Sequence, residues 1–253
     1  MRTLISYFRF IRVLFHMVVV VLSSYILLPI IGMQPWRKFT HQRWSKNMLR
    51  AIGAEVIVHS SLGEEWKQPN TMFVQNHVSW LDTMVMNSVY GASYVGKVEM
   101  LQWKLLKNVI IAGETIFIDR KNKRELVLAN KKIAAALEKG GAMGLFAEGT
   151  TSDGTTVLPF HASIFESAIL AKSRIVPVVV RYRNEDGSLC REVTFSKKKW
   201  MESVWSTLRM KKIIIKVDVL EPVYATDFEN REAISDYMYE QISKVYHSDL
   251  KKV

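Results

Sequence analysis

After residue 50, short apolar runs alternate along the chain with longer stretches in which apolar residues recur at helical spacing. Runs such as residues 176–180 are apolar throughout, which is typical of strands in a sheet that helices cover on both faces. The alternation predicts an α/β fold whose mixed, mostly parallel sheet is flanked by helices. The expected strands span residues 55–59, 71–75, 93–96, 115–119, 142–147, 175–182 and 213–220, and the expected helices span residues 80–90, 100–108, 125–139, 163–172, 200–208 and 231–251.

The N-terminal part of the chain shows a different pattern. Residues 13–32 contain no charged side chain when His16 is neutral, and about twenty such residues can cross the hydrocarbon core of a bilayer as one helix. The run is too long for a secretory signal peptide, lacks a clear small-x-small cleavage site, and contains a valine block with no polar face. We therefore expect residues 1–50 to form a membrane-embedded helical segment and residues 51–253 to form the α/β domain.

Two arrangements of this segment fit the sequence. Basic residues lie before the apolar run and in greater number after it, which favours a single span with the main domain on the cytoplasmic side. Pro29, Gly32 and Pro35 also interrupt the run. A re-entrant helical hairpin that enters and leaves one leaflet would place both basic flanks at the headgroups. Both arrangements stay open at this point.

The composition narrows the kind of partner. A formal net charge of +11 and a pI of about 9.6 favour anionic lipid headgroups, an acidic carrier, a phosphorylated cofactor or nucleic acid. Nucleic acid is not expected, because no nucleic-acid-binding motif is present and the apolar segment would tether the chain to a membrane. The single cysteine, Cys190, and the lack of a CxxC or HExxH pattern predict no disulfide within the chain and no metal site.

The run NHVSWLD, residues 76–82, sets His77 five residues before Asp82. A neutral imidazole can take a proton from an alcohol near neutral pH, and a carboxylate on its other nitrogen fixes the tautomer. The spacing alone also fits a polar loop in which Asn76 and Asp82 bind backbone groups. The chain has no GxSxG nucleophile elbow, so Ser79 is expected to cap a helix rather than to attack a substrate.

Three further polar clusters accompany apolar runs. They are GETIFIDR, which ends at Arg120, FAEGTTSDG over residues 146–154, and the proline-containing strand IVPVVV. Together with NHVSWLD, and in this order, they resemble the sequence blocks of the glycerolipid acyltransferase family, the lysophosphatidic acid acyltransferases and their relatives. The upstream segment RWSKNMLRAIGAEVIVHS is also similar, so the resemblance covers roughly residues 40–220.

The resemblance implies direct transfer of a fatty acyl group from a thioester to an acceptor hydroxyl. His77 is then the general base, and Asp82 orients and polarises it. Arg120 is expected to hold a phosphate of the acceptor, with Lys97 as a second headgroup contact. The FAEGTTSDG block is expected to complete the acceptor site with Glu148, Gly149 and Thr150.

Two departures from the family pattern bear on the acceptor. Ala147 stands where the family usually has proline, and Thr151 stands where phosphatidate-forming members commonly carry arginine. The second departure removes one charge-assisted contact from a phosphate site, worth about 1.5–3 kcal/mol. The expected reaction is conversion of 1-acyl-glycerol-3-phosphate to phosphatidate. Acylation of another lysolipid such as lyso-ornithine lipid is the alternative, and a catalytically silent membrane lipid-binding protein is the alternative of a different class.

The resemblance also sets the expected partners and location. The partners are membrane lipids, a lysophospholipid acceptor, and acyl-CoA or acyl-acyl carrier protein as the donor, with no bound cofactor. The expected location is a bacterial inner membrane, with the catalytic domain on the cytoplasmic side.

Overall fold

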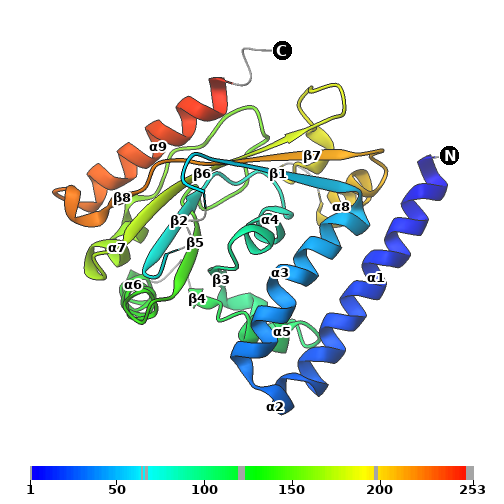
Figure 1. Ribbon diagram of the computed structural model, residues 1–253, viewed down its shortest axis with the longest axis horizontal. Coiled ribbons are helices and arrows are strands. Elements are labelled where there is room, and N and C mark those ends of the chain that lie inside the picture. The colour runs from blue at the N-terminus through cyan, green and yellow to red at the C-terminus, as the bar shows by residue number, and fades with distance from the viewer. Residues whose placement is uncertain (1, 64, 66–67, 119–122, 197–198, 249–253) are drawn as a thin grey trace.

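The computed structural model describes residues 2–63, 65, 68–118, 123–196 and 199–248 (Figure 1). An eight-stranded sheet lies at its centre, in the order β1-β7-β6-β2-β5-β3-β4, with β8 paired to β6. Neighbouring strands from β6 to β4 are parallel, whereas β7 is antiparallel to β6. The predicted mixed, mostly parallel sheet is therefore confirmed. Its strands are β1 (Ala54–Ser60), β2 (Thr71–Gln75), β3 (Ser93–Lys97), β4 (Ile116–Ile118), β5 (Ala142–Phe146), β6 (Arg174–Arg183), β7 (Ile213–Val219) and β8 (Val223–Tyr224).

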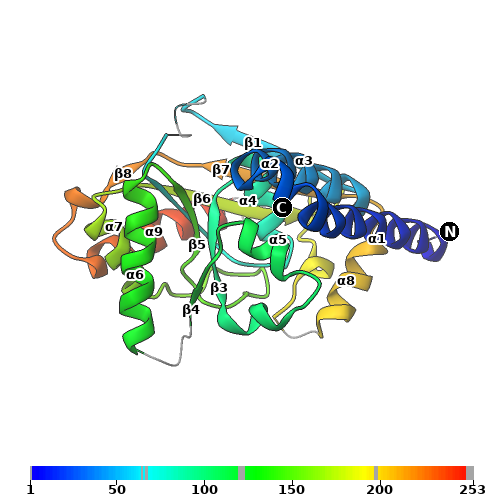
Figure 2. The same cartoon turned by 90° about the horizontal axis from the view of Figure 1, so that it is seen from below.

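Helices cover both faces of the sheet, as the uninterrupted apolar strands predict (Figures 1 and 2). One face packs against α3 (Met33–Ile52), α4 (Asp82–Val89) and α8 (Trp200–Leu208). The other packs against α6 (Lys123–Glu138), α7 (Glu166–Leu170) and α9 (Arg231–Ser248). Side chains alternate between the two cores along β2 and β6, so β6 sends Val178 and Val180 to the first core and Val179 to the second.

The N-terminal segment folds back on itself. Helices α1 (Arg2–Ile26), α2 (Leu28–Ile31) and α3 form a helical hairpin, and α1 also contacts α5 (Lys107–Ala112) and α8. The Arg9 guanidinium donates hydrogen bonds to the carbonyl oxygens of Met210 and Lys211, just beyond the end of α8. Gly53 ends α3 with a φ of +88°, and a Cβ there would lie 2.0 Å from Nη2 of Arg9. This glycine therefore serves both the helix end and the docking of α1.

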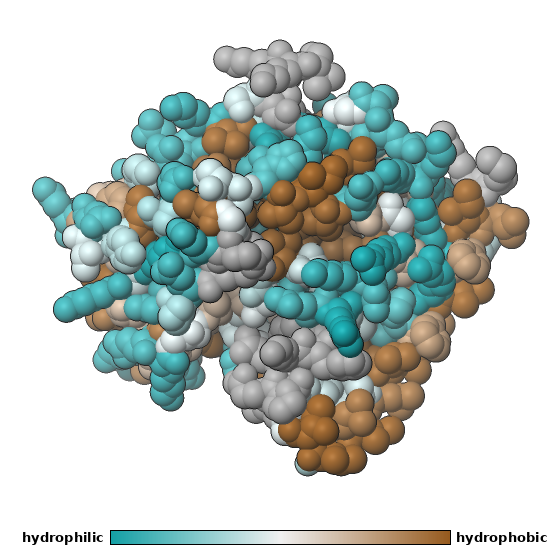
Figure 3. Space-filling view, viewed as in Figure 1, coloured by the Kyte–Doolittle hydropathy of each residue, from teal (hydrophilic) through white to brown (hydrophobic). Residues whose placement is uncertain are grey.

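Helix α1 buries small polar side chains together with Val20 and exposes most of its large apolar side chains. Ser6, Ser23 and Ser24 are buried, whereas large apolar side chains recur every three or four residues on the exposed side. Figure 3 shows apolar side chains gathered at the lower right of the molecule, over α1 and α2. By length and composition, residues 3–26 are long and apolar enough to cross a membrane. The exposed large apolar side chains of α1 are those of Leu4, Tyr7, Phe8, Phe10, Ile11, Leu14, Phe15, Val18, Val19, Leu22, Tyr25 and Ile26.

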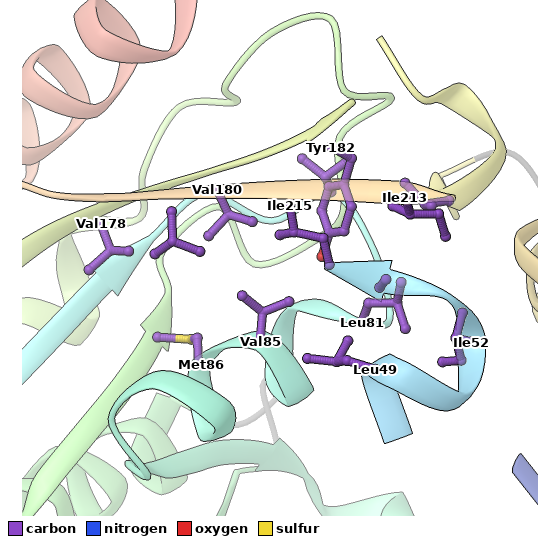
Figure 4. Packing of buried hydrophobic residues seen from close by; sticks show 14 of the residues in the cluster. Leu49, Ile52, Leu81, Val85, Met86, Val178, Val180, Tyr182, Ile213 and Ile215 are labelled. Atoms are coloured by element: carbon purple, nitrogen blue, oxygen red, sulfur yellow. The ribbon is translucent and has the colours of Figure 1, made fainter. Parts of the chain in front are cut away.

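The end of α3 belongs to the core of the sheet. The expected division between residues 50 and 51 falls inside this helix. Leu49 and Ile52 pack with Leu81 and Val85 beneath β6 and β7 (Figure 4). The hairpin and the α/β body are thus joined by a shared apolar cluster as well as by the chain.

Two expected helices differ from the structure. Residues 100–108 do not form one helix: a 3-10 helix, η1 (Val98–Gln102), is followed by a turn and then by α5. The N–H of Trp103 donates to the Met100 carbonyl and that of Leu106 to the Trp103 carbonyl, so two successive three-residue turns replace the expected helix there. Between residues 163 and 172 the structure has a 3-10 turn, η2 (Ala162–Phe165), and the short α7. The end of the expected C-terminal helix, residues 249–251, lies outside the described residues.

Replacing Leu49 by alanine should destabilise the whole α/β body, because this side chain is 1% exposed within the main core. We expect the free energy of unfolding to fall by about 2–5 kcal/mol. Urea denaturation in detergent, followed by circular dichroism, measures the change. Leu128→Ala on α6 is the matched control, since Leu128 is 48% exposed, and should cost about 0.5 kcal/mol or less. Equal costs for the two variants would show that α3 is not part of the core.

Candidate active site

The site residues come together at one edge of the sheet. Strands β2, β3, β5 and β6 are parallel, so their carboxyl ends share this edge. His77 follows β2, Lys97 ends β3, and Gly149 follows β5. The side chain of Asn76 holds the end of β2 against β6, because its amide donates to the Val180 carbonyl at 2.9 Å and accepts from the Val180 N–H at 2.8 Å.

His77 and Asp82 form a hydrogen-bonded pair. Nδ1 of His77 lies 2.7 Å from Oδ2 of Asp82. An ionised carboxylate only accepts hydrogen bonds, so Nδ1 is the nitrogen that donates to it, and in the neutral ring the lone pair is then on Nε2. The imidazole stacks on Phe146, with ring centroids 4.1 Å apart and planes 19° from parallel. The hydrogen bond and the stacking hold the ring in place. The side chain is 21% exposed, so the ring can be reached from outside.

The carboxylate of Asp82 is fully buried and satisfied by several donors. Oδ2 also accepts the backbone N–H groups of Val78 and Ser79, at 2.7 and 2.8 Å. Oδ1 accepts the Tyr182 hydroxyl at 2.5 Å. Asp82 is also the first residue of α4, where the helix dipole favours a negative charge. These donors compensate for the loss of water around the carboxylate.

Tyr182 was not predicted from the sequence. It lies on β6, one hundred residues from Asp82, and its side chain is on the same face of the strand as those of Val178 and Val180. Its pKa is raised well above the ordinary value, first because the hydroxyl is buried and then because Asp82 is negative. The phenol therefore stays protonated and serves Asp82 as a hydrogen-bond donor. Only the pairing of β6 with β2 reveals this role.

Glu148 connects the block after β5 to the histidine. Oε1 accepts the backbone N–H of His77 at 2.6 Å, and Oε2 accepts that of Leu158 at 2.9 Å. The backbone carbonyl of His77 in turn accepts the N–H of Ser152 at 2.7 Å. Burial is the main reason that the pKa of Glu148 is raised to about 7, with a smaller contribution from the charge of Asp82. Glu148 thus fixes the position of the backbone at His77.

Three of the other predicted site residues line the cavity that contains His77, and one lies outside the described residues. Gly149, Thr150 and the exposed Lys97 line the same cavity as His77. Gly149 has a φ of +69°, a left-handed conformation that glycine adopts without strain. Arg120 lies outside the described residues.

Neither Ser79 nor Cys190 is placed as a nucleophile. Helix α4 begins only at Asp82, so Ser79 does not cap it as predicted; its buried hydroxyl instead donates to the Val193 carbonyl and accepts the Leu81 N–H. Cys190 is buried, which raises the pKa of its thiol to about 12. Within the described part of the chain, the His77 ring is hydrogen-bonded to Asp82 alone.

A cavity of about 970 Å³ opens from His77 toward the N-terminal helices. Its wall includes Phe146, which stacks on His77, together with Trp80, Trp200 and side chains of α1, α3 and α5. Most of these side chains are apolar. The shape and lining suit a long hydrocarbon chain whose polar end reaches His77.

Comparison with known proteins agrees with this fold. The acyltransferase family model matches residues 54–181, which contain His77, Asp82 and Glu148. This match covers half of the chain, and the chain belongs to the acyltransferase family.

Relatives and a solved structure resemble most of the chain. The 1-acyl-sn-glycerol-3-phosphate acyltransferase of Neisseria gonorrhoeae is 34% identical over 79% of this chain and 80% of its own. The lyso-ornithine lipid O-acyltransferase of Brucella abortus is 31% identical over 71% of this chain and 72% of its own. The crystal structure of the 1-acyl-sn-glycerophosphate (LPA) acyltransferase PlsC from Thermotoga maritima matches with a TM-score of 0.73 and 17% identity, over 98% of this chain and 97% of that one. The last comparison supports the fold.

The raised pKa of Glu148 predicts how stability depends on pH. The carboxyl titrates near 7 in the folded chain and near its ordinary 4.5 when unfolded, so the folded state holds the proton more tightly. Its contribution to the free energy of unfolding is complete below pH 4.5 and is lost as the pH rises through 7, by on the order of 3 kcal/mol.

Glu148→Gln removes this titration and is the reference for its measurement. Denaturation of both proteins between pH 5 and 8 should show the wild type losing stability relative to the variant as the pH rises. Parallel pH profiles for the two proteins would contradict the assignment of the raised pKa to Glu148.

Proposed function

We propose that this acyltransferase moves a fatty acyl group from a thioester to the free hydroxyl of a lysophospholipid, without an acyl-enzyme intermediate. The observation that carries the proposal is a histidine that is oriented by a buried carboxylate and faces a long, largely apolar cavity. The described residues place no serine, threonine or cysteine in hydrogen-bond contact with its ring. The acceptor hydroxyl is therefore the natural nucleophile.

In this mechanism His77 acts first as a base and then as an acid. Nε2 takes the proton of the acceptor hydroxyl while its oxygen attacks the thioester carbonyl. The tetrahedral intermediate collapses, the carbon–sulfur bond breaks, and Nε2–H returns the proton to the leaving sulfur. Asp82 remains ionised throughout and stabilises the imidazolium through Nδ1–H. Tyr182 and the amides of Val78 and Ser79 hold Asp82 in place.

The proposed acceptor is 1-acyl-glycerol-3-phosphate, and lyso-ornithine lipid is the alternative. The relatives described above carry the names of both activities. Lys97 at the cavity supplies a cation for an anionic headgroup, and Arg120 is proposed as the phosphate contact. We propose that Glu148 shapes the acceptor site through the backbone of His77, with Gly149 and Thr150 along its wall. Acyl-CoA and acyl-acyl carrier protein both fit the thioester chemistry as donors.

Replacing His77 by alanine should abolish acyl transfer, because no base then accepts the proton of the attacking hydroxyl. Asp82→Asn should reduce kcat by about a hundred-fold or more, since it disturbs the tautomer of His77. Mass detection of the lipid product from labelled acyl thioester and a lysophospholipid measures both effects. His59→Ala is the matched control, because His59 is an exposed histidine on β1.

Three outcomes of this assay separate the alternatives. Near-normal transfer by a folded His77→Ala protein would overturn the mechanism. Release of free fatty acid at the same rate with and without acceptor would indicate a thioesterase. Absence of any turnover by wild-type protein across acceptors and donors would favour a silent lipid-binding protein.

We further propose that α1 lies within one leaflet of the membrane rather than crossing it. Arg9 binds backbone carbonyl oxygens beyond α8, and Tyr7 packs edge-on against Trp205 of α8 at 5.3 Å, so the start of the helix rests on the catalytic body. The chain then returns through α2 to α3. The outward apolar stripe faces the acyl chains of one leaflet. The basic residues of the segment and the positive-inside rule favour the cytoplasmic leaflet of a bacterial inner membrane.

Replacing Phe15 and Leu22 together by glutamine should weaken membrane binding by about ten-fold or more, because each buries a large apolar side chain in lipid. These residues are 63% and 52% exposed on the same side of α1. Flotation with phosphatidylglycerol–phosphatidylethanolamine vesicles measures the bound fraction. The matched control replaces Val127 and Leu128, which are similarly exposed on α6, by glutamine. Equal loss in both variants would contradict the special role of α1.

A further inference from the structure

The turn that leads from η1 into α5 exposes large apolar side chains. It spans residues 102–107 and is called the apolar turn below. Trp103 is 50% exposed and Leu105 is 73% exposed. By contrast, the turn over residues 184–188 has the sequence NEDGS, which is typical of a turn surrounded by water. The apolar turn therefore has the composition of a contact surface rather than of a solvated loop.

The apolar turn adjoins the exposed apolar surface of α1. The Tyr25 hydroxyl donates a hydrogen bond to the Lys104 carbonyl at 3.3 Å, and α1 contacts α5. Tyr25 is itself one of the exposed residues near the end of α1. Figure 1 shows α5 beside the lower part of α1, close to α2. The two surfaces thus meet, and a contiguous exposed apolar surface marks an interaction site where a single exposed residue would not.

Backbone hydrogen bonds hold the apolar turn in its position. The N–H groups of Leu106 and Lys107 both donate to the Trp103 carbonyl, at 3.0 and 2.8 Å. The Trp103 N–H donates to the Met100 carbonyl at 3.1 Å. The exposed side chains are therefore presented by an ordered backbone, and little conformational entropy is lost when they bind.

The charges around the apolar turn fit an anionic partner. Lys104 and Lys107 are exposed within it, and Lys97 is exposed at the end of β3. Glu99 is the acidic residue between positions 97 and 107, so the stretch is basic. A tryptophan ring prefers the boundary between headgroups and acyl chains, and a lysine beside it can extend its ammonium group to a headgroup phosphate. This combination fits a leaflet that contains anionic phospholipid.

We propose that the apolar turn inserts Trp103 and Leu105 into the same membrane leaflet as α1, with Lys104 and Lys107 on anionic headgroups. This rests on the proposed function and location, and it places a second membrane contact on the catalytic body itself. Trp103 also lines the cavity that contains His77. The cavity wall therefore reaches the lipid at the apolar turn, and a lysolipid enters the cavity beside Trp103 directly from the leaflet.

Leu105→Gln tests the insertion, because Leu105 is exposed and is not among the described residues that line the cavity. Its affinity for phosphatidylglycerol–phosphatidylethanolamine vesicles, titrated by flotation, should fall about ten-fold. Leu170→Gln is the matched control and should bind like the wild type, since Leu170 is 46% exposed on α7, which packs on the opposite face of the sheet. Equal melting temperatures without lipid show that both variants are folded.

The tryptophan itself reports its depth in the membrane. Bromine atoms on the acyl chains of the vesicle lipids quench the emission of a tryptophan that reaches the hydrocarbon. The wild type should show a quenched component that Trp103→Phe lacks, whereas the other tryptophans contribute equally to both proteins.

Replacing Lys104 and Lys107 together by glutamine tests the headgroup contact. The Lys104 carbonyl that accepts the Tyr25 hydroxyl is unchanged in this variant. Binding should weaken about ten-fold on vesicles that contain phosphatidylglycerol and should be unchanged on phosphatidylcholine vesicles. The matched control replaces Lys131 and Lys132, two exposed lysines of α6, by glutamine and should bind both kinds of vesicle like the wild type.

Activity measurements connect the contact to lipid entry. Leu105→Gln should lose transfer to a lysolipid embedded in vesicles in proportion to its bound fraction. Its transfer to a short-chain lysophospholipid dissolved as a monomer should equal that of the wild type.

Two results would overturn the inference alone. One is wild-type vesicle binding by both Leu105→Gln and the double lysine variant. The other is a double lysine variant that binds vesicles normally but loses transfer from acyl-acyl carrier protein and not from acyl-CoA, which would assign the apolar turn to the carrier protein. Absence of transfer to every acceptor by wild-type protein would instead overturn the proposed function, while the vesicle and quenching measurements would still decide the membrane contact.

Discussion

The arrangement of the site depends on one buried carboxylate, that of Asp82. It accepts hydrogen bonds from Nδ1–H of His77, from two backbone amides of the segment before α4, and from the hydroxyl of Tyr182. These donors come from the loop after β2 and from β6, and Asp82 itself begins α4, so a single charge joins three elements of the fold. If any donor were lost, a buried charge would be left partly unsatisfied, at a cost in stability as well as in the orientation of His77.

A second buried carboxylate supports the first from the neighbouring strand. Glu148 holds the backbone amide of His77, so the loop after β5 and the loop after β2 move as one unit. The two acids have different environments. Asp82 has a tyrosine hydroxyl, a histidine and the helix terminus near its oxygens. The oxygens of Glu148 accept the backbone amides of His77 and Leu158, and its pKa is raised to about 7. In the proposed mechanism, Asp82 supplies the charge and Glu148 supplies the geometry.

Local patterns in the sequence were sufficient for much of the sheet and for the histidine–aspartate pair. The apolar runs within β2 and β6, two strands that are buried along their whole length, follow directly from burial on both faces. The pairing of His77 with Asp82 needs only five residues of chain. Tyr182 could not be found in this way, because a strand tyrosine in an apolar run is indistinguishable from a core residue. Its role arises from contact between segments one hundred residues apart. The turn between η1 and α5 was also missed, because the apolar residues between 100 and 108 fit a continuous helix and give no signal for the break.

Helix α1 separates two environments by the thickness of one helix, about 10 Å. Phe15 and Leu22 are exposed on its outer side, whereas Val20 is buried and lines the catalytic cavity. In the proposed arrangement, a lipid in the cavity is divided from the bilayer by a single layer of side chains. The acceptor then arrives by lateral diffusion, and its tail never crosses water. The concentration that governs turnover is consequently the mole fraction of lysolipid in the bilayer, so diluting the membrane with inert lipid slows the enzyme even when the bulk molarity of substrate is constant.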